Sequence, residues 1–451
     1  MMRSKNVDML SGSIIKGLLS MAIPIMIMNV MQSMFNIIDM TALEFFSDDR
    51  SVGAVGACGT LISLCTSLLI GLSAGANVVV AKRLGAGDRT RADKAVMTAL
   101  LVAITGGILI GIAGITFSET FLRWTNCPEE LLSKSTTYFR LYFCGLPILM
   151  FYNFCASILR AMGDTKRPMY FLILGGIINV SFTILFITVF NMTVEGVAIA
   201  TVISFLVIGI LAFTTLLRSN EIIHINFHEI KFDLKELKEI LFIGIPSGLQ
   251  TAMYSFANVI IMTTVNSFGA DATTGISIAN QFDGILYQIT YAPSLAVIPY
   301  VAQNIGAKNI KRAKQVVIRA VLITTIFGAT FGSLSAIFSR QLASIMASSE
   351  VVIAFARQKM VLISSTYFIC GINEIMGGVL KGMGKPIFPT IATFLYMCLF
   401  RFVWVYGIYP LFPQNLTFLY LVWPVGWILS IITLLFVYYP TKKKLEKQFV
   451  Q

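Results

Sequence analysis

The sequence predicts an all-α membrane protein with twelve transmembrane helices, arranged as two pseudo-symmetric lobes of six helices. Three observations predict this fold class: the composition, the length of the apolar segments and an internal repeat. Hydrophobic residues make up 56% of the 451 residues and charged residues 12%, whereas soluble domains carry roughly 25% charged residues. The apolar segments reach about 20 residues or more, which is the length that a bilayer-spanning helix requires. They lack the alternation of polar and apolar residues that a transmembrane β-barrel would show.

The internal repeat divides the chain into two related halves. Residues 80–86 recur at 301–307, and residues 159–163 recur at 380–384, so both pairs share one offset. An Ile-Pro pair opens each half, at Ile23-Pro24 and at Ile245-Pro246. Paired halves of this kind are typical of membrane transporters in which one half moves against the other.

The twelve predicted spans are apolar stretches bounded by charged residues, proline or glycine. They lie at 14–41, 52–80, 92–117, 134–161, 168–190, 195–217, 238–265, 275–303, 313–338, 351–382, 386–410 and 417–439. The N-lobe (1–217) holds the first six spans, and the C-lobe (238–451) holds the other six and a basic C-terminal tail. Residues 218–237 form a charged amphipathic linker, which we expect to lie along the cytoplasmic membrane surface.

The distribution of lysine and arginine orients the chain in the membrane. Most of the 34 lysines and arginines fall in segments on the side of both termini, whereas the opposite segments hold only Arg50, Arg123, Lys134, Arg340, Arg357 and Lys359. Because cytoplasmic segments carry the excess of positive charge, we expect a multi-pass protein of the cell membrane with both termini in the cytoplasm. The net charge of +12 then reflects attraction to anionic lipid, and no nucleic acid is needed to explain it.

Charged residues inside the predicted spans are candidates for function, because each costs about 2.5–3.5 kcal/mol on insertion scales. The candidates are Asp39, Arg140, Asp283, Glu374 and Arg401. For the two arginines we expect pairing with acidic residues or an extended side chain that reaches the membrane interface, rather than contact with a substrate.

Asp39 ends a polar stripe on the first span. Asn36, Gln32 and Asn29 precede it at helical spacing, so the four side chains share one face of the helix. A polar stripe on an otherwise apolar helix indicates a water-filled cavity. The alternative is a residue at the outer membrane boundary, solvated by the acidic loop that follows.

Two further carboxylates lie in the second half, each beside amide side chains. Asp283 follows Asn280 and Gln281 in the eighth span, and Glu374 follows Asn373 in the tenth. A carboxyl group in a low-dielectric cavity can exchange protons near neutral pH, or it can hold Na⁺ together with nearby oxygens. The alternative is a structural carboxylate held by a partner such as Arg401. The amides that we expect in a substrate cavity are Gln32, Asn153, Asn280, Gln281 and Asn373.

Pro24 and Pro246 occupy equivalent places in the two halves, and each removes a helix hydrogen bond, so both are candidate hinges. The alternative for each is a tolerated kink without motion.

His224 and His228 stand four residues apart in the linker but have no third ligand nearby, so we expect no metal site. The sequence contains no nucleotide-binding motif and no catalytic set of side chains. We therefore expect neither an enzyme nor a cofactor.

These motifs resemble the multidrug and toxic compound extrusion (MATE) family. The resemblance is carried by Gly85-Ala86 and 301–307, by 160–164 and 381–386, by the two Ile-Pro pairs, and by Asp39 after Phe35-Asn36, and it covers essentially the whole chain. It implies a monomer of two six-helix lobes, surrounded by membrane lipid, that exports small organic cations or other amphiphiles. It also implies that inward movement of H⁺ or Na⁺ drives the export.

The resemblance implies a cation site in the N-lobe. Asp39, with Asn36 beside it, matches the first-span acid that binds the coupling cation. Asn179 matches the fifth-span pattern Asn-x-x-x-Asp, but Thr183 stands at the position of the acid. This site therefore has one carboxylate where many relatives have two.

The resemblance also implies a C-lobe site. Glu374 resembles a tenth-span acid that some members use there, although residues 250–266 contain no seventh-span acid of the kind those members carry. In the eighth span Asp283 keeps the usual acid, whereas Gln281 replaces the arginine that commonly precedes it.

We therefore expect a cation-coupled antiporter for multidrug efflux. One alternative is a lipid-linked oligosaccharide flippase of the same superfamily, which would carry a strongly cationic cavity, whereas Arg140 and Arg401 are the only basic residues that we assign to the interior of the membrane rather than to its two sides. A second alternative is a non-transporting membrane receptor or scaffold, which would not need two homologous halves.

Overall fold

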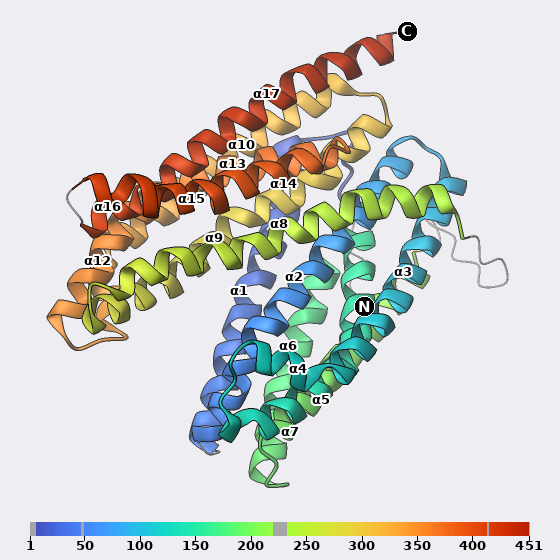
Figure 1. Cartoon of the computed structure of the whole chain (residues 1–451). Coiled ribbons are helices and arrows are strands. Elements are labelled where there is room, and N and C mark those ends of the chain that lie inside the picture. The colour runs from blue at the N-terminus through green and yellow to red at the C-terminus, as the bar shows by residue number, and fades with distance from the viewer. Residues whose placement is uncertain (1–5, 47–48, 220–231, 413–414, 451) are drawn as a thin grey trace. The chain divides into compact units, whose positions relative to one another are not determined.

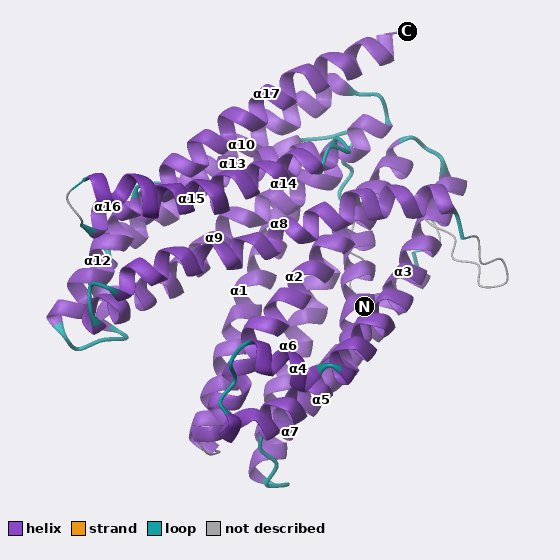
Figure 2. Ribbon diagram, viewed as in Figure 1, coloured by secondary structure: helices purple, strands orange, loops and turns teal. Residues whose placement is uncertain are grey.

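The computed structural model describes residues 6–46, 49–219, 232–412 and 415–450. Within these ranges the description leaves out the side chains of 36–37, 39–40, 44, 46, 49–50, 255–257, 259 and 449–450. Throughout the described chain every regular element is a helix, as Figure 2 shows. The predicted all-α class is therefore confirmed.

The order of long and short helices along the chain is similar in the two halves. The first half contains α1 (Ile14–Phe46), α2 (Asp49–Gly85), α3 (Arg89–Thr116), α4 (Ser118–Trp124), α5 (Glu129–Ala161), α6 (Lys166–Thr188) and α7 (Val194–Leu217). The second half contains α8 (Leu234–Asn266), α9 (Ala270–Gly306), α10 (Ile310–Ile337), α11 (Ser339–Ser344), α12 (Glu350–Ser365), α13 (Tyr367–Gly382), α14 (Ile387–Thr393), η1 (Phe394–Leu399), α15 (Phe400–Val403), η2 (Trp404–Ile408), η3 (Tyr409–Leu411), α16 (Leu416–Tyr420) and α17 (Val422–Val450). Even the short helices α4 and α11 recur, each directly after a long one.

Each predicted span coincides with one helix or with consecutive helical pieces. Ten stretches of the described chain are long and apolar enough to cross a membrane, and the bent pair α12–α13 makes eleven. The remaining predicted span, 238–265, falls within α8, a helix of 33 residues. The structure is thus that of a multi-span membrane protein.

The chain folds into two compact units. It passes between them after Val7, ahead of α1, and again inside α1 and inside α8. Unit 1 comprises the described residues up to Val7 and Ile27–Gly248, and unit 2 comprises Asp8–Met26 and the described residues from Leu249 onward. The predicted division at 218–237 follows the repeat, whereas the units change within α1 and α8. The reason is that the first part of each of these helices packs with the other half of the repeat. Of the predicted linker, 220–231 lie outside the described residues.

In unit 1, α5 packs between α2, α3 and α7, and α6 packs on α7 (Figure 1). The first part of α8 lies against α2 at two glycines. A β-carbon on Gly75 would stand 2.2 Å from the carbonyl oxygen of Ile240, and one on Gly71 would stand 2.2 Å from the Cα of Gly248. Backbone contact this close excludes any side chain at these positions.

In unit 2, α9 packs on α10, α12 and α13, and α13 packs on α17 (Figure 1). Ala292 and Ala296 of α9 are equivalent in the repeat to the two glycines of α2, and both are fully buried. Leu18 and Ala22 in the first part of α1 are buried as well. Small residues thus occupy equivalent positions on the second long helix of each half, and in unit 1 these positions mark the face where the first part of α8 packs.

The second half departs from straight helices in two places. The chain bends by 49° between α12 and α13. Between Ile387 and Leu411 the helix contains two π-helical segments, η1 and η2, on either side of the four-residue α15. Neither departure was predicted, because neither place carries a proline at the break. π-helical segments widen the helix locally and are frequent at functional sites.

Candidate functional site

Glu374 lies on α13 inside unit 2 and is 5% exposed. The hydroxyl of Tyr254 on α8 donates a hydrogen bond of 2.7 Å to Glu374 Oε1. The ring of Tyr254 packs against Tyr287 of α9, and the ring of Tyr287 stacks on Tyr291. Glu374 is thus a buried carboxylate beside a row of tyrosines from two neighbouring helices.

The close crossing of α9 and α13 sets the position of Glu374. Ser294 Oγ of α9 donates a 2.8 Å hydrogen bond to the Glu374 carbonyl oxygen. One turn further along α13, a β-carbon on Gly378 would stand 2.8 Å from the same Ser294 oxygen. The glycine therefore lets the two backbones approach, and the serine bond fixes their register.

A buried ion pair lies in the same unit. Lys359 Nζ of α12 is 2.8 Å from Asp283 Oδ2 of α9, with side-chain exposures of 2% and 13%. The ammonium group also donates to Asn280 Oδ1. Tyr367 donates a 2.9 Å hydrogen bond to the Asp283 carbonyl oxygen. Asp283 is therefore held on both sides, which agrees with the structural alternative, but its partner is Lys359 and not Arg401.

The sequence reasoning missed Lys359 because it was counted among residues of an outer segment. The structure places Lys359 in the buried face of α12, together with Val352, Ala356 and Ile363. These positions follow the three- and four-residue spacing of one helix face. The spacing is visible in the sequence and could have identified Lys359, because Arg357, two residues away, falls on the exposed face.

Arg401 of α15 is 3% exposed. Its Nη1 donates a 2.8 Å hydrogen bond to Asn258 Oδ1, whereas its Nε has no hydrogen-bond partner. The guanidinium carbon lies 5.2 Å from the centre of the Trp423 ring, and Lys359 Nζ lies 5.4 Å from the same ring. No ion pair joins Arg401 to any carboxylate that the structure describes.

Arg140 of α5 differs from Arg401 in that it is exposed. Its Nε donates a 2.9 Å hydrogen bond to Ser118 Oγ at the start of α4. Among the described residues neither arginine pairs with an acid, so the expected arginine–carboxylate pairs are not seen. Arg140 has the surroundings of a structural residue.

The amides expected in the second-half cavity lie in different surroundings. Asn280 and Gln281 are exposed on α9. Asn373, beside Glu374 on α13, is 5% exposed, and its Oδ1 has no hydrogen-bond partner among the described atoms. Only Asn280 is joined to the charged groups of this unit, through Lys359.

In unit 1, Asn179 and Thr183 lie one turn apart on the buried face of α6. Asn179 Nδ2 donates a 3.1 Å hydrogen bond to Thr201 Oγ1 of α7. One turn earlier, Ser204 Oγ of α7 donates a 2.8 Å bond to the Gly175 carbonyl. Asn179 and Thr183 therefore both face the helix bundle, and their role in a cation site stays a prediction.

The first-span residues are only partly described. Asp39 and Asn36 belong to α1, but their side chains lie outside the described part of the structure. Gln32, on the same helix, is exposed. Asn153 of α5 is partly buried, and its Nδ2 donates a 3.0 Å hydrogen bond to the Leu149 carbonyl within its own helix.

Pro24 and Pro246 lie inside the uninterrupted helices α1 and α8. Pro24 stands just before Met26, the last residue of its stretch in unit 2, and Pro246 just before Gly248, the last residue of unit 1. Each proline thus lies where the chain passes from one compact unit to the other.

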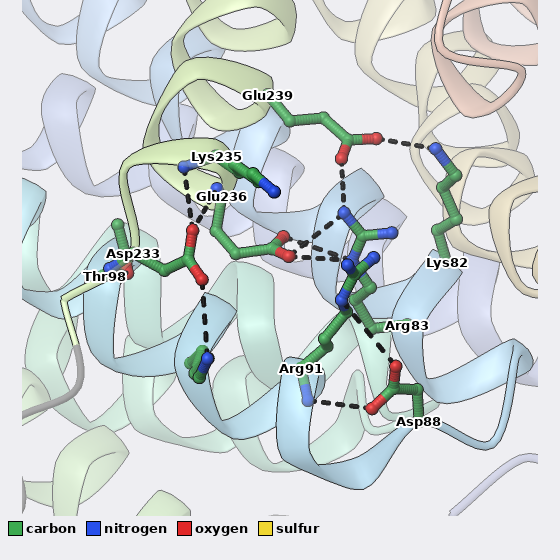
Figure 3. Close-up of polar contacts among 10 residues, drawn as sticks. Lys82, Arg83, Asp88, Arg91, Thr98, Asp233, Lys235, Glu236 and Glu239 are labelled. Atoms are coloured by element: carbon green, nitrogen blue, oxygen red, sulfur yellow. Dashed lines mark hydrogen bonds and ion pairs between the residues drawn. The ribbon is translucent and has the colours of Figure 1, made fainter.

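A cluster of charged residues holds the start of α8 to the end of α2 in unit 1 (Figure 3). We call Lys82, Arg83, Glu236 and Glu239 the Arg83 cluster. Arg83 Nε donates to both carboxylate oxygens of Glu236 at 3.1 Å, and Arg83 Nη2 lies 2.6 Å from Glu239 Oε2. Lys82 Nζ lies 2.7 Å from Glu239 Oε1. Because Glu236 is only 2% exposed, the cluster is partly desolvated.

Asp233 precedes α8 and caps its first turn. Its Oδ1 accepts hydrogen bonds from the backbone N–H groups of Lys235 at 2.8 Å and Glu236 at 3.4 Å. The bond from Lys235, the bond from Glu236 and the nearby charge of Lys94 together lower the pKa of Asp233 below its ordinary value. Its own backbone N–H donates to Thr98 Oγ1 of α3, as Figure 3 shows.

The equivalent place in unit 2 uses backbone carbonyls instead of carboxylates. Asn304, equivalent to Arg83 in the repeat, donates a 3.1 Å hydrogen bond to the Met9 carbonyl. Arg312, equivalent to Arg91, donates to the carbonyls of Met9 at 3.1 Å and Gly12 at 3.1 Å. The segment before α1 is thus attached to unit 2 by neutral acceptors, whereas the start of α8 is attached to unit 1 by ion pairs.

No group of three or more histidine, cysteine, aspartate or glutamate side chains could hold a metal ion in the part of the chain that the structure describes. His224 and His228 lie outside the described residues.

Comparison with known proteins agrees with this architecture. The MatE family model matches the chain twice, over residues 24–185 and 246–406, so the two matches confirm the internal repeat. The chain is 26% identical to the probable multidrug resistance protein YoeA of Bacillus subtilis, over 82% of this chain and 81% of that protein. It is 27% identical to the probable multidrug resistance protein YpnP of the same organism, over 85% of this chain and 86% of that protein.

The fold is similar to that of solved transporters. A MOP superfamily transporter from Pyrococcus furiosus superposes with a TM-score of 0.90 and 20% identity, and the match covers 99% of this chain and all of that one. An identity this low supports the fold alone. The relatives are transporters and not enzymes, in agreement with the expectation from the sequence. Because the family model matches both halves and more than half of the residues, the chain belongs to the MatE family of membrane transporters.

Proposed function

We propose that the protein is a cation-coupled antiporter of the cell membrane that exports small organic cations or amphiphiles in exchange for H⁺ or Na⁺. The observation that carries the proposal is Glu374, a carboxylate 5% exposed inside unit 2 that accepts a hydrogen bond from Tyr254. A carboxylate at this depth is stable only when a proton, a cation or a hydrogen-bond donor balances its charge. Binding and release of a cation at Glu374 therefore changes the energy of the helices around it.

A second cation position is proposed in unit 1, at Asp39 with Asn179. The packing of α1 on α6 supports it, because the ring of Phe35 lies where a β-carbon on Gly176 would stand, 1.9 Å from Phe35 Cε2. Position 39 follows Phe35 by about one helical turn, and Asn179 follows Gly176 by about the same distance. Thr183 would supply a hydroxyl where an acid stands in many relatives, so this position would hold one carboxylate.

Pro24 and Pro246 are proposed as the hinges of the transport cycle. Each lies where a continuous helix leaves one compact unit for the other. A proline removes one backbone hydrogen bond and lowers the cost of bending at that point. Bending at both prolines would change the orientation of the two units without breaking either helix.

Dye efflux from proteoliposomes tests the proposal. Ethidium export would be measured with a pH gradient alone, with a Na⁺ gradient alone and with neither, which also identifies the coupling ion. Glu374→Gln is expected to abolish gradient-driven export, while Glu350→Gln, an exposed acid paired with Arg340, is expected to export normally. Asp39→Asn tests the unit 1 position in the same assay. Equal export by wild type and Glu374→Gln would remove the basis of the proposal.

The two alternatives have less support. A flippase for lipid-linked oligosaccharides and a receptor or scaffold would both give no gradient-driven dye efflux in this assay. We further propose that the protein acts as a monomer with both termini in the cytoplasm. Labelling of a cysteine introduced beyond Glu446, in intact cells and in inverted vesicles, would test the side on which the C-terminus lies.

A further inference from the structure

Arg401 is a buried cation whose charge no described acid balances. The guanidinium is 3% exposed, makes its best hydrogen bond to a neutral amide, and leaves Nε without a partner. The two carboxylates inside this unit are already committed, because Asp283 pairs with Lys359 and Glu374 accepts from Tyr254. The Trp423 ring, 5.2 Å away, offsets part of the cost of burying this charge. A buried charge without a counter-ion is unusual in folded proteins, so the surroundings of Arg401 favour the binding of an anion.

The backbone around Arg401 is unusual in a second, independent way. Arg401 belongs to α15, and the π-helical segments η1 and η2 lie directly before and after it. A π-helical turn rotates the residues that follow it relative to a regular helix. Two such segments flank the four-residue helix that carries Arg401, and π-helical turns are frequent at functional sites.

We propose that Arg401 is a binding residue for the oxyanion of a small organic acid, a carboxylate or phosphate carried by an amphiphilic cargo. A guanidinium presents a planar fork of N–H donors that matches two oxygens of such a group. Nε, which has no partner in the structure, is one donor of that fork. Lys359, on the same tryptophan ring, adds positive charge to the site while its own ion pair with Asp283 holds it in place.

This inference rests on the proposed export function for its physiological meaning, since it names the class of cargo that unit 2 accepts. Its binding test does not depend on transport. The probes are two forms of one rhodamine dye, the methyl ester and the corresponding acid, because they share the aromatic cation and differ in one carboxylate. Binding is measured by fluorescence polarisation on the full-length protein in nanodiscs of phosphatidylcholine.

Wild type is expected to bind the acid more tightly than the ester. Arg401→Gln is expected to weaken binding of the acid by about tenfold to a hundredfold, the effect of losing a charge-assisted hydrogen bond, and to leave the ester unchanged. Arg401→Lys keeps the charge but loses the fork, so it should fall between the two. The control is Arg140→Gln, which removes an exposed arginine bonded to Ser118 and should change neither dye. An equal loss of both dyes in Arg401→Gln would assign a merely structural role to Arg401 and overturn the proposal.

A measurement on the unmodified protein keeps the proposal testable if the variants do not fold. Benzoate should displace the acid dye but not the ester, and displacement of both or of neither would overturn the proposal.

Nanodiscs that contain phosphatidylglycerol distinguish a cargo from a lipid. Loss of acid binding in those nanodiscs would show that the headgroup of an anionic lipid occupies Arg401 and would overturn the assignment to a cargo. If wild type binds the acid selectively but exports neither dye under a pH or Na⁺ gradient, the antiport proposal fails and the binding site stands.

Discussion

Lys359 Nζ and Asp283 Oδ2 lie 2.8 Å apart in the interior of unit 2 and join α12 to α9. Removing one partner of a buried pair leaves the other charge without compensation, which costs about 3–5 kcal/mol. Lys359→Met should therefore lower the melting temperature of the purified protein markedly. The double variant Lys359→Met/Asp283→Asn should recover most of the loss, because no unpaired charge remains.

The matched control for this pair is Arg340→Met. Arg340 and Glu350 form an ion pair of 2.9 Å with side-chain exposures of 62% and 73%, so its loss should cost about 1 kcal/mol or less. Melting curves in one detergent provide the comparison. Equal stability of Lys359→Met and Arg340→Met would mean that the buried pair contributes nothing to the fold.

The crossing of α2 and α8 should tolerate no side chain at Gly75. A β-carbon there would stand 2.2 Å from the Ile240 carbonyl oxygen, so Gly75→Ala must push the two backbones apart, at a cost of about 1–3 kcal/mol or more. Gly59→Ala, on the same helix, meets no atom within 4 Å and should stabilise by about 0.5–1 kcal/mol, since alanine favours a helix over glycine. Melting temperatures that shift in the same direction in both variants would contradict this account of the crossing.

Much of the fold could be predicted because the length of the apolar segments and the internal repeat can both be read directly from the sequence. The predicted span 195–217 lies inside α7, and 168–190 overlaps α6 almost completely. The passage of the chain between units at Met26 and Gly248 could not be predicted, because the residues on both sides of each boundary are equally apolar. The π-helical segments around Arg401 could not be predicted either, since they depend on packing rather than on a local sequence signal.

The site was predicted in part for a similar reason. A carboxylate inside a span demands compensation, which drew attention to Glu374 and Asp283, and the structure places Glu374 in the interior. Partners are set by tertiary packing, so Tyr254, a neutral residue, and Lys359, near the end of a span, were not identified. The suggestion that Arg401 holds one of the acids was wrong for Asp283, whose partner is Lys359.

Arg83 should be the principal residue that holds the start of α8 to unit 1. Glu236 is 2% exposed and receives both of its 3.1 Å bonds from Arg83 Nε, so Arg83→Met leaves a buried carboxylate without a cation. We expect a loss on the order of 3 kcal/mol. Arg91→Met is the control, because its contact with Asp88 is 3.9 Å long and exposed and should contribute little. Faster proteolytic cleavage near residue 234 in Arg83→Met than in Arg91→Met would agree, and equal rates would not.

Acidification should loosen the first turn of α8 through Asp233. The backbone bonds from Lys235 and Glu236, and the charge of Lys94, lower the pKa of this carboxylate in the folded protein. A lowered pKa means that the group stabilises the fold above its unfolded pKa of about 3.9. That contribution is lost as the pH falls below this value and through the folded pKa. Hydrogen exchange at the amides of Lys235 and Glu236, corrected for intrinsic rates, should therefore accelerate as the pH falls below about 4.

The variant Asp233→Asn distinguishes the contribution of the Asp233 charge from that of its capping hydrogen bonds. Asparagine can accept the same backbone hydrogen bonds but does not titrate, so the variant should show slightly faster exchange at neutral pH and a weaker increase on acidification. The cap of α10 provides an internal reference, because Asn309 accepts from the Arg312 N–H at 3.0 Å and carries no charge. Exchange that accelerates equally in wild type and in Asp233→Asn would show that protonation of Asp233 does not govern the acid sensitivity of this end of α8.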